Sequence, residues 1–198
     1  MAAVHVPVLP PNAPRMGNRL TRWVGRSLLR IMGWKLRGEF PDESRLVVAL
    51  APHTSNWDFF IAFAALMATG VRVSYLMKKE AFIWPFRNFF IRWGGIPTDR
   101  QAAQDTVGQI RQWYREHSKV WVAITPEGTR SKVNRWKTGF LRIAYAAEVP
   151  VLLVTWDYPG KTMTVDRCWP LTGDIDTDLP SIQDYVNKHY QGRDPGKQ

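Results

Sequence analysis

One histidine and one aspartate stand five positions apart in residues 52–58, and their types and spacing suit proton transfer. His53 is followed by Asp58 just after the apolar run 46–51, which we expect to be a strand. In an open α/β sheet, sites are built in the loops at the carboxyl ends of the strands. Histidine is the usual general base because it titrates near neutral pH, and a carboxylate can fix its tautomer and stabilise the imidazolium. His53 and Asp58 are therefore a candidate catalytic pair.

The same segment has a structural interpretation. Ser55 and Asp58 precede an apolar run at the spacing of a capping box, in which the acid accepts hydrogen bonds from backbone N–H groups at the start of a helix. The His-x4-Asp spacing alone does not decide between the two interpretations.

A second polar segment, residues 125–131, follows another expected strand, Val120–Ile124. Gly128 allows a tight turn, Thr129 supplies a hydroxyl, and Arg130 offers a planar guanidinium that suits phosphate. The alternative interpretation is a surface turn with solvated charges.

A third segment, residues 94–100, is a glycine turn that ends in Arg100. Its arginine could close on the same anion as Arg130. The alternative is a helix C-terminal cap followed by an ordinary loop.

Together, in this order, the segments resemble the glycerolipid acyltransferase family, which acylates glycerol 3-phosphate and lysophosphatidate. That family carries a His-x4-Asp block, a Gly-x-Ile-x-x-x-Arg block, a Pro-Glu-Gly-Thr-Arg-Ser block and a Val-Pro-x-x-x-Val block. In this chain the blocks are residues 53–58, 94–100, 126–131 and 149–154. Residues 136–140 are also similar to the family's Lys-x-Gly step, and Pro52 stands where the family usually has Asn.

The resemblance implies transfer of a fatty acyl chain to the hydroxyl of lysophosphatidate in phospholipid biosynthesis. The donor would be the thioester of acyl-CoA or acyl carrier protein. His53 would take the proton of the attacking hydroxyl, and Asp58 would orient His53. Base catalysis of this kind contributes ~10²–10⁴-fold. We expect no metal, no cofactor and no covalent enzyme intermediate, because the thioester is already activated.

The resemblance also implies an acceptor site for phosphate and glycerol, formed by Glu127, Gly128, Thr129, Arg130 and Arg100. Because a carboxylate is an odd neighbour for phosphate, we expect Glu127 to hold an arginine. Another lysolipid, an aminolipid or a glycolipid, could serve as acceptor in the same chemistry. A basic membrane- or nucleic-acid-binding module without activity would explain the charge but not the ordered blocks, and intact His53 and Asp58 argue against it.

The N-terminal part of the chain predicts contact with a membrane. Residues 1–14 are rich in proline and are expected to be a flexible leader, and residues 15–37 are expected to form a basic amphipathic helix. At about 100° per residue, five arginines fall on one side and six apolar residues on the other: Arg15, Arg19, Arg22, Arg26 and Arg30, against Met16, Leu20, Trp23, Val24, Leu28 and Ile31. A helix lying in a membrane interface has this pattern. The alternative is a helix packed on its own domain with a solvated basic face.

Residues 38–198 are expected to form a single α/β acyltransferase domain, because strand-like and helix-like segments alternate. This order favours a mostly parallel sheet flanked by helices. The expected strands are 46–51, 71–75, 120–124 and 149–156, and the expected helices are 59–68, 101–116, 139–147 and 181–190.

The amino-acid composition limits which partners the protein could bind and where in the cell it could act. The net charge is +10, and residues 1–37 hold seven arginines or lysines and no acid. A basic surface favours a polyanion, and ten tryptophans favour the membrane interface over nucleic acid. No apolar run reaches the ~18 residues of a transmembrane helix. The single cysteine excludes an intramolecular disulfide and favours a reducing setting. We therefore expect a peripheral, monotopic protein on the cytoplasmic face of the membrane.

Overall fold

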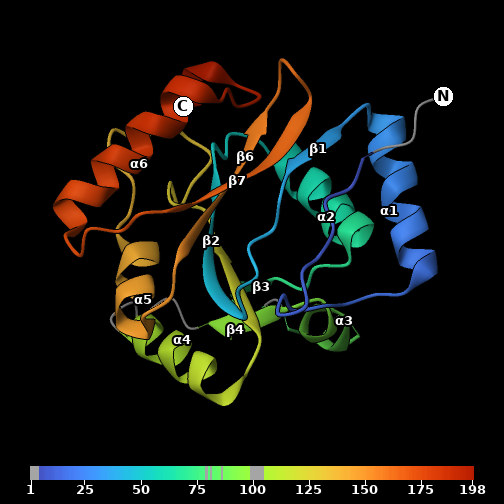
Figure 1. Cartoon of the computed structure of the whole chain (residues 1–198), viewed down its shortest axis with the longest axis horizontal. Helices are drawn as coiled ribbons and strands as arrows, with labels where there is room; N and C mark the ends of the chain where they lie inside the picture. Colours follow the sequence, from blue (N-terminus) through green and yellow to red (C-terminus); the bar gives the residue numbers. More distant parts are fainter. Residues whose placement is uncertain (1–4, 79, 81, 86, 99–104) are drawn as a thin grey trace.

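The computed structural model describes residues 5–78, 80, 82–85, 87–98 and 105–198. Within these residues, seven strands form one sheet in the order β1-β7-β6-β2-β5-β3-β4 (Figure 1). Neighbouring strands are parallel except β6 and β7, which are antiparallel. The strands are β1 (Lys35–Gly38), β2 (Arg45–Ala51), β3 (Ser74–Lys78), β4 (Gly95–Thr98), β5 (Val120–Ile124), β6 (Val151–Asp157) and β7 (Thr162–Trp169).

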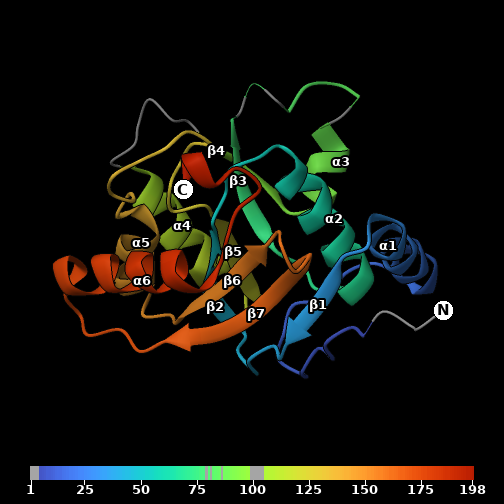
Figure 2. The same cartoon turned by 90° about the horizontal axis from the view of Figure 1, so that it is seen from above.

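Helices cover both faces of the sheet. Figure 2 shows α1, α2 and α3 on one side and α4, α5 and α6 on the other. The helices are α1 (Arg19–Met32), α2 (Trp57–Thr69), α3 (Arg87–Arg92), α4 (Asp105–Glu116), α5 (Gly139–Ala147) and α6 (Ile175–His189), and a short 3₁₀ helix, η3 (Pro195–Lys197), follows. The expected α/β class with a mostly parallel sheet and flanking helices is confirmed.

The central strand β2 explains why the sheet is sandwiched. Its Leu46 and Val48 pack into the core beneath α1 and α2, and its Val47 and Ala49 pack into the core beneath α4, α5 and α6. The sequence of a strand that is buried on both faces is a continuous run of apolar residues, as is typical of parallel sheets. The carboxyl ends of β2, β5 and β6 therefore lie side by side at one edge of the sheet.

The helix expected over residues 15–37 is shorter than predicted. It begins at Arg19, where the Asn18 side chain accepts a hydrogen bond from the Thr21 backbone, and it ends at Gly33, whose φ is 73°. The prediction for the last residues was wrong, because the left-handed glycine stops the helix and Lys35–Gly38 becomes strand β1 beside β7. Strands β1, β4 and β7 were not predicted at all.

The leader, which we expected to be flexible, contacts the domain in its described part, residues 5–14. Leu9 and Ala13 are buried in the core under α1 and α2. Asn12 donates two hydrogen bonds to the Asp42 carboxylate. Arg15 lies outside the helix and donates to the carbonyl of Leu9.

Helix α1 packs closely on α2. A Cβ atom on Gly25 would lie 2.3 Å from the backbone nitrogen of Ala68 and 2.7 Å from the carbonyl oxygen of Ala64. Glycine and alanine at this crossing let the two backbones approach, and Leu29 one turn further is fully buried. One face of α1 is thus fixed to the domain.

We expect Gly25→Val to lower the thermal stability of the protein, because the added side chain would force α1 away from α2. Overpacking costs about 1–3 kcal/mol, which corresponds to a fall in Tm of about 2–12 °C for a chain of this size. The matched control is Gly139→Ala in α5, where an added Cβ meets no atom within 4 Å. An unchanged Tm for Gly25→Val, measured by calorimetry, would contradict the packing of α1 on α2.

Candidate active site

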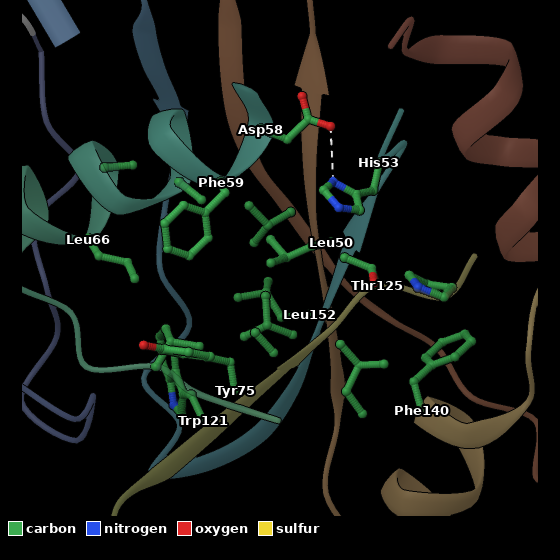
Figure 3. Close-up of a pocket in the computed structure, with 18 of the residues that line it drawn as sticks. Leu50, His53, Asp58, Phe59, Leu66, Tyr75, Trp121, Thr125, Phe140 and Leu152 are labelled. Carbon is green, nitrogen blue, oxygen red and sulfur yellow. Dashed lines mark hydrogen bonds and ion pairs between the residues drawn. The ribbon is translucent and has the colours of Figure 1, made fainter. Parts of the chain in front are cut away.

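The structure brings His53 and Asp58 together at the carboxyl end of β2. His53 lies in the loop after β2, and Asp58 lies in the first turn of α2. The Nδ1 atom of His53 is 3.0 Å from Oδ2 of Asp58 (Figure 3). The aspartate side chain is fully buried and the histidine ring is 17% exposed. An ionised carboxylate only accepts hydrogen bonds, so Nδ1 carries a proton and, in the neutral ring, Nε2 is the free base.

Asp58 also accepts backbone hydrogen bonds, as the capping alternative predicts, but from the loop before α2 rather than from the helix, whose N-cap residue Asn56 makes no side-chain cap hydrogen bond. Oδ2 of Asp58 accepts hydrogen bonds from the backbone N–H groups of Thr54 and Ser55, both at 3.0 Å. One oxygen therefore holds both the histidine ring and the loop that carries it. The catalytic and structural interpretations of this segment therefore involve the same carboxylate oxygen.

Tyr158 is a member of the site that the sequence analysis missed. Its hydroxyl donates a hydrogen bond to Oδ1 of Asp58. Burial and the contact with Asp58 raise the pKa of the Tyr158 phenol far above its ordinary value, so it remains a donor at physiological pH. Tyr158 lies 100 residues after Asp58, and no local spacing links the two. The one feature of the sequence that pointed to Tyr158 was its position just after the expected strand 149–156.

Glu127 does not have the expected role. Its Oε1 accepts a hydrogen bond of 2.9 Å from the backbone N–H of His53, so among the described residues this oxygen holds the loop after β2 rather than an arginine. The reason lies in the sheet, because β2 and β5 are neighbours and their following loops meet. Burial raises the pKa of the Glu127 carboxyl, and the His53 N–H partly offsets this rise.

A cavity of about 970 Å³ opens beside His53 and Asp58. It is lined by residues of the sheet and α2 and also by residues of α4 and α5, such as Val107 and Phe140, and most of its wall is apolar. Figure 3 shows His53 at one end with apolar side chains below it: Leu50, Phe59, Leu66, Trp121 and Leu152. A substrate whose reacting group lay next to His53 could extend an apolar chain into the rest of this cavity.

The second polar segment lies on the rim of the cavity. Gly128 and Arg130 line it, together with Lys137, which the sequence analysis quoted only within a family motif. In the described chain Thr129 lies outside the cavity wall, and its hydroxyl accepts a hydrogen bond from the backbone of Ser131. Arg130 and Lys137 are both exposed, so two cations stand at the opening.

The third polar segment is described only in part. Gly94, with φ of 93°, donates to the Ile91 carbonyl and ends α3 as the capping alternative predicts, and Gly95–Thr98 forms β4. Arg100 lies outside the described residues. No group of three or more histidine, cysteine, aspartate or glutamate side chains in the described part of the chain could hold a metal ion.

Comparisons with known proteins identify the family and the fold. A family model described as Acyltransferase matches residues 35–156, well over half of the chain. The chain therefore belongs to the acyltransferase family, and the resemblance to glycerolipid acyltransferases is confirmed.

The fold is similar to the crystal structure of the 1-acyl-sn-glycerophosphate (LPA) acyltransferase PlsC from Thermotoga maritima. The TM-score is 0.55 at 16% identity, over 88% of this chain and 81% of that chain. At this identity the likeness establishes the fold. No curated protein sequence matches the chain.

We expect Tyr158→Phe to lower kcat for acyl transfer about tenfold, which corresponds to ~1.4 kcal/mol, with KM unchanged. The substitution leaves a buried carboxylate without one of its donors, which costs about 1.5–3 kcal/mol of stability.

The matched control is Tyr145→Phe, because Tyr145 also donates to a buried aspartate, Asp178, on the opposite side of the sheet. Both variants should lose thermal stability, and only Tyr158→Phe should lose turnover. Equal kcat values in the two variants would show that Tyr158 has a structural role alone.

Proposed function

We propose that this protein transfers a fatty acyl chain from the thioester of acyl-CoA or acyl carrier protein to the hydroxyl of lysophosphatidate. The observation that carries the proposal is the His53–Asp58 pair at one end of a large apolar cavity that has two cations, Arg130 and Lys137, on its rim. The pair suits proton transfer, the cavity suits an acyl chain, and the cations suit a phosphate.

In the proposed reaction, Nε2 of His53 takes the proton of the acceptor hydroxyl as its oxygen attacks the thioester carbonyl. A C–O bond forms, the C–S bond breaks, and the leaving thiolate takes the proton from His53. Asp58 stabilises the imidazolium between these steps. The donors around Asp58 hold its carboxylate fixed, so little reorganisation is needed when the charge on His53 appears.

The cavity accounts for a fatty acyl substrate. Its wall is formed by residues from the sheet, α2, α4 and α5, and polar side chains gather at the end where the strands finish. Burial of each methylene stabilises a bound chain by about 0.8 kcal/mol. A long acyl chain would therefore bind more tightly than a short one.

Arg130 and Lys137 support a phosphate on the acceptor. Arg130 can grip two phosphate oxygens with its planar fork, and Lys137 adds a point charge beside it. A Cβ on Gly128 would lie 2.8 Å from the Lys137 side chain, so glycine lets the loop approach the lysine. An aminolipid or glycolipid without phosphate would gain little from this pair.

Helix α1 supports a peripheral position on an anionic membrane. Its inner face, with Gly25 and Leu29, is buried, so the packing alternative holds for that face. Leu20, Trp23 and Ile31 point away from the domain and are 66%, 66% and 81% exposed. The exposed Arg19, Arg26 and Arg30 lie on the stripe beside them, and each arginine near an anionic surface contributes ~1 kcal/mol.

No helix in the described residues is long and apolar enough to cross a membrane.

The first test is removal of the proposed base. We expect His53→Ala to lower the rate of acyl transfer from labelled acyl-CoA to lysophosphatidate by about 10²–10⁴-fold. Asp58→Asn should lose most activity, because an amide can donate to Nδ1 and permit the wrong tautomer. His117→Ala is the control, since His117 hydrogen-bonds to the Trp113 carbonyl in another part of the chain. Near-normal rates in a folded His53→Ala protein would exclude the mechanism.

The second test concerns the acceptor. Arg130→Lys keeps the positive charge but removes the planar guanidinium that can bind two phosphate oxygens at once. We therefore expect KM for lysophosphatidate to rise about tenfold, with KM for the thioester unchanged. Arg135→Lys is the control, because Arg135 pairs with Asp176 on the surface. A lysolipid without phosphate should barely respond to Arg130→Lys. Equal losses on both acceptors would remove the phosphate assignment and favour a role for Arg130 in holding its loop.

A further inference from the structure

Five aromatic rings form a continuous row along α2, which we call the aromatic ridge: Trp57, Phe60, Phe59, Phe63 and Trp93. Successive ring centroids lie 5.6, 5.8, 6.2 and 4.7 Å apart. The ridge begins at the catalytic loop and ends just after α3. Trp57, Phe59 and Phe60 are each more than half exposed.

More apolar surface continues beside the end of the ridge. Ile83 and Trp84, which precede α3, are 61% and 90% exposed, and Ile91 within α3 is 38% exposed. Apart from Val8, the large apolar side chains that are exposed in the described residues belong either to α1 or to this region. Exposed apolar surface gathered in this way marks an interaction site rather than scattered surface residues.

The ridge is also the rim of the cavity. Phe59, Phe60 and Phe63 line the cavity, and Phe59 and Phe60 are at the same time exposed to solvent. Side chains that line the cavity and are also exposed to solvent lie at an opening of the cavity. Figure 3 shows the Phe59 ring on the α2 side of the cavity, beside Leu50. Hydrocarbon could therefore pass over the ridge into the cavity without crossing a polar surface.

We propose that the aromatic ridge, with Ile83 and Trp84, penetrates an anionic bilayer and is the entrance through which lipid chains move between bilayer and cavity. The inference rests on the proposed function in that the substrate is a lipid. It assigns a second membrane contact, separate from α1, on the side of the sheet that α1, α2 and α3 share (Figure 2).

The charges around the ridge fit a bilayer better than a protein partner. Among residues 57–98, the charged side chains described as exposed are Arg72, Arg87 and Arg92, against Glu80. The Arg193 guanidinium lies 5.4 Å from the centroid of the Trp57 ring. Arginine and tryptophan together are typical of the headgroup layer, with cations at the phosphates and indoles at the interface. A protein seated on the ridge would instead close the entrance.

The direct test measures insertion. In a Cys168→Ser background, Ile83→Cys carries an environment-sensitive fluorophore, and the matched control Lys188→Cys carries it on α6, across the sheet. Vesicles of phosphatidylcholine with phosphatidylglycerol should shift the emission at position 83 to shorter wavelength and leave position 188 unchanged. Equal responses at both positions, or none at position 83, would overturn the proposal. So would emission at position 83 that is already shifted in a dimer without vesicles, because a second copy would then cover the ridge.

The kinetic test uses the double variant Ile83→Ser with Trp84→Ser, two residues that do not line the cavity. We expect KM for lysophosphatidate in vesicles to rise about tenfold or more, since two apolar side chains no longer partition into lipid. KM for a dispersed short-chain acceptor should stay the same. Unchanged kinetics on vesicles would contradict the inference.

The two proposals fail separately. A shift at position 83 in a protein that acylates no lysolipid would refute the proposed function alone. Normal acylation of lysophosphatidate with no shift would refute the membrane entrance alone.

Discussion

The site depends on the hydrogen bonds that the buried carboxylate of Asp58 accepts. A fully buried charge is costly unless hydrogen bonds replace its water, and Asp58 receives four donors: the His53 ring, the N–H groups of Thr54 and Ser55, and the Tyr158 hydroxyl. These donors come from the loop after β2 and from the turn after β6. The requirement to solvate one anion therefore fixes the position of the histidine and joins two separate parts of the chain.

The contacts one layer further out hold these donors in place. Glu127 accepts from the backbone of His53, and the backbone N–H of Asp194 donates to the Thr54 hydroxyl at 3.2 Å. The backbone N–H of Tyr158 donates to the carbonyl of Gln191. Segments that follow β2, β5 and β6, and the segment after α6, thus meet at one point. They can do so because β6, β2 and β5 are neighbours in the sheet, so their carboxyl ends share an edge.

The sequence predicted those parts of the fold that local pattern determines. The buried runs of β2, β5 and β6 and the periodic residues of α5 lie where expected, because burial on both faces leaves an uninterrupted apolar signal. Strand β7 was missed because its apolar residues alternate with polar ones, such as Thr164 and Asp166, and give no continuous apolar run. Strand β1 was missed because the apolar spacing of α1 continues past Gly33, and only the left-handed turn there ends the helix.

The site shows the same limit. The His53–Asp58 contact was predictable because both residues lie within one loop and one helical turn. The roles of Tyr158 and Glu127 were not, since they depend on which strands are neighbours. Strand order is set by long-range packing, which no short motif records.

Helix α2 connects the cavity to the exposed aromatic ridge through an unusual distribution of side-chain size. Most helices on a sheet place large apolar residues inward. In α2, Ala62 and Ala65 line the cavity beside the larger Phe63 and Leu66, and Ala64 and Ala68 meet Gly25 of α1. The large rings of Trp57, Phe59 and Phe60 are exposed. Small residues on the inner side leave space between helix and sheet, which would otherwise fill with side chains at the density of a protein core. Large rings on the outer side are unfavourable in water and favourable at a bilayer interface. A single helix that is apolar all round can thus provide room for an acyl chain on one side and contact with its lipid source on the other.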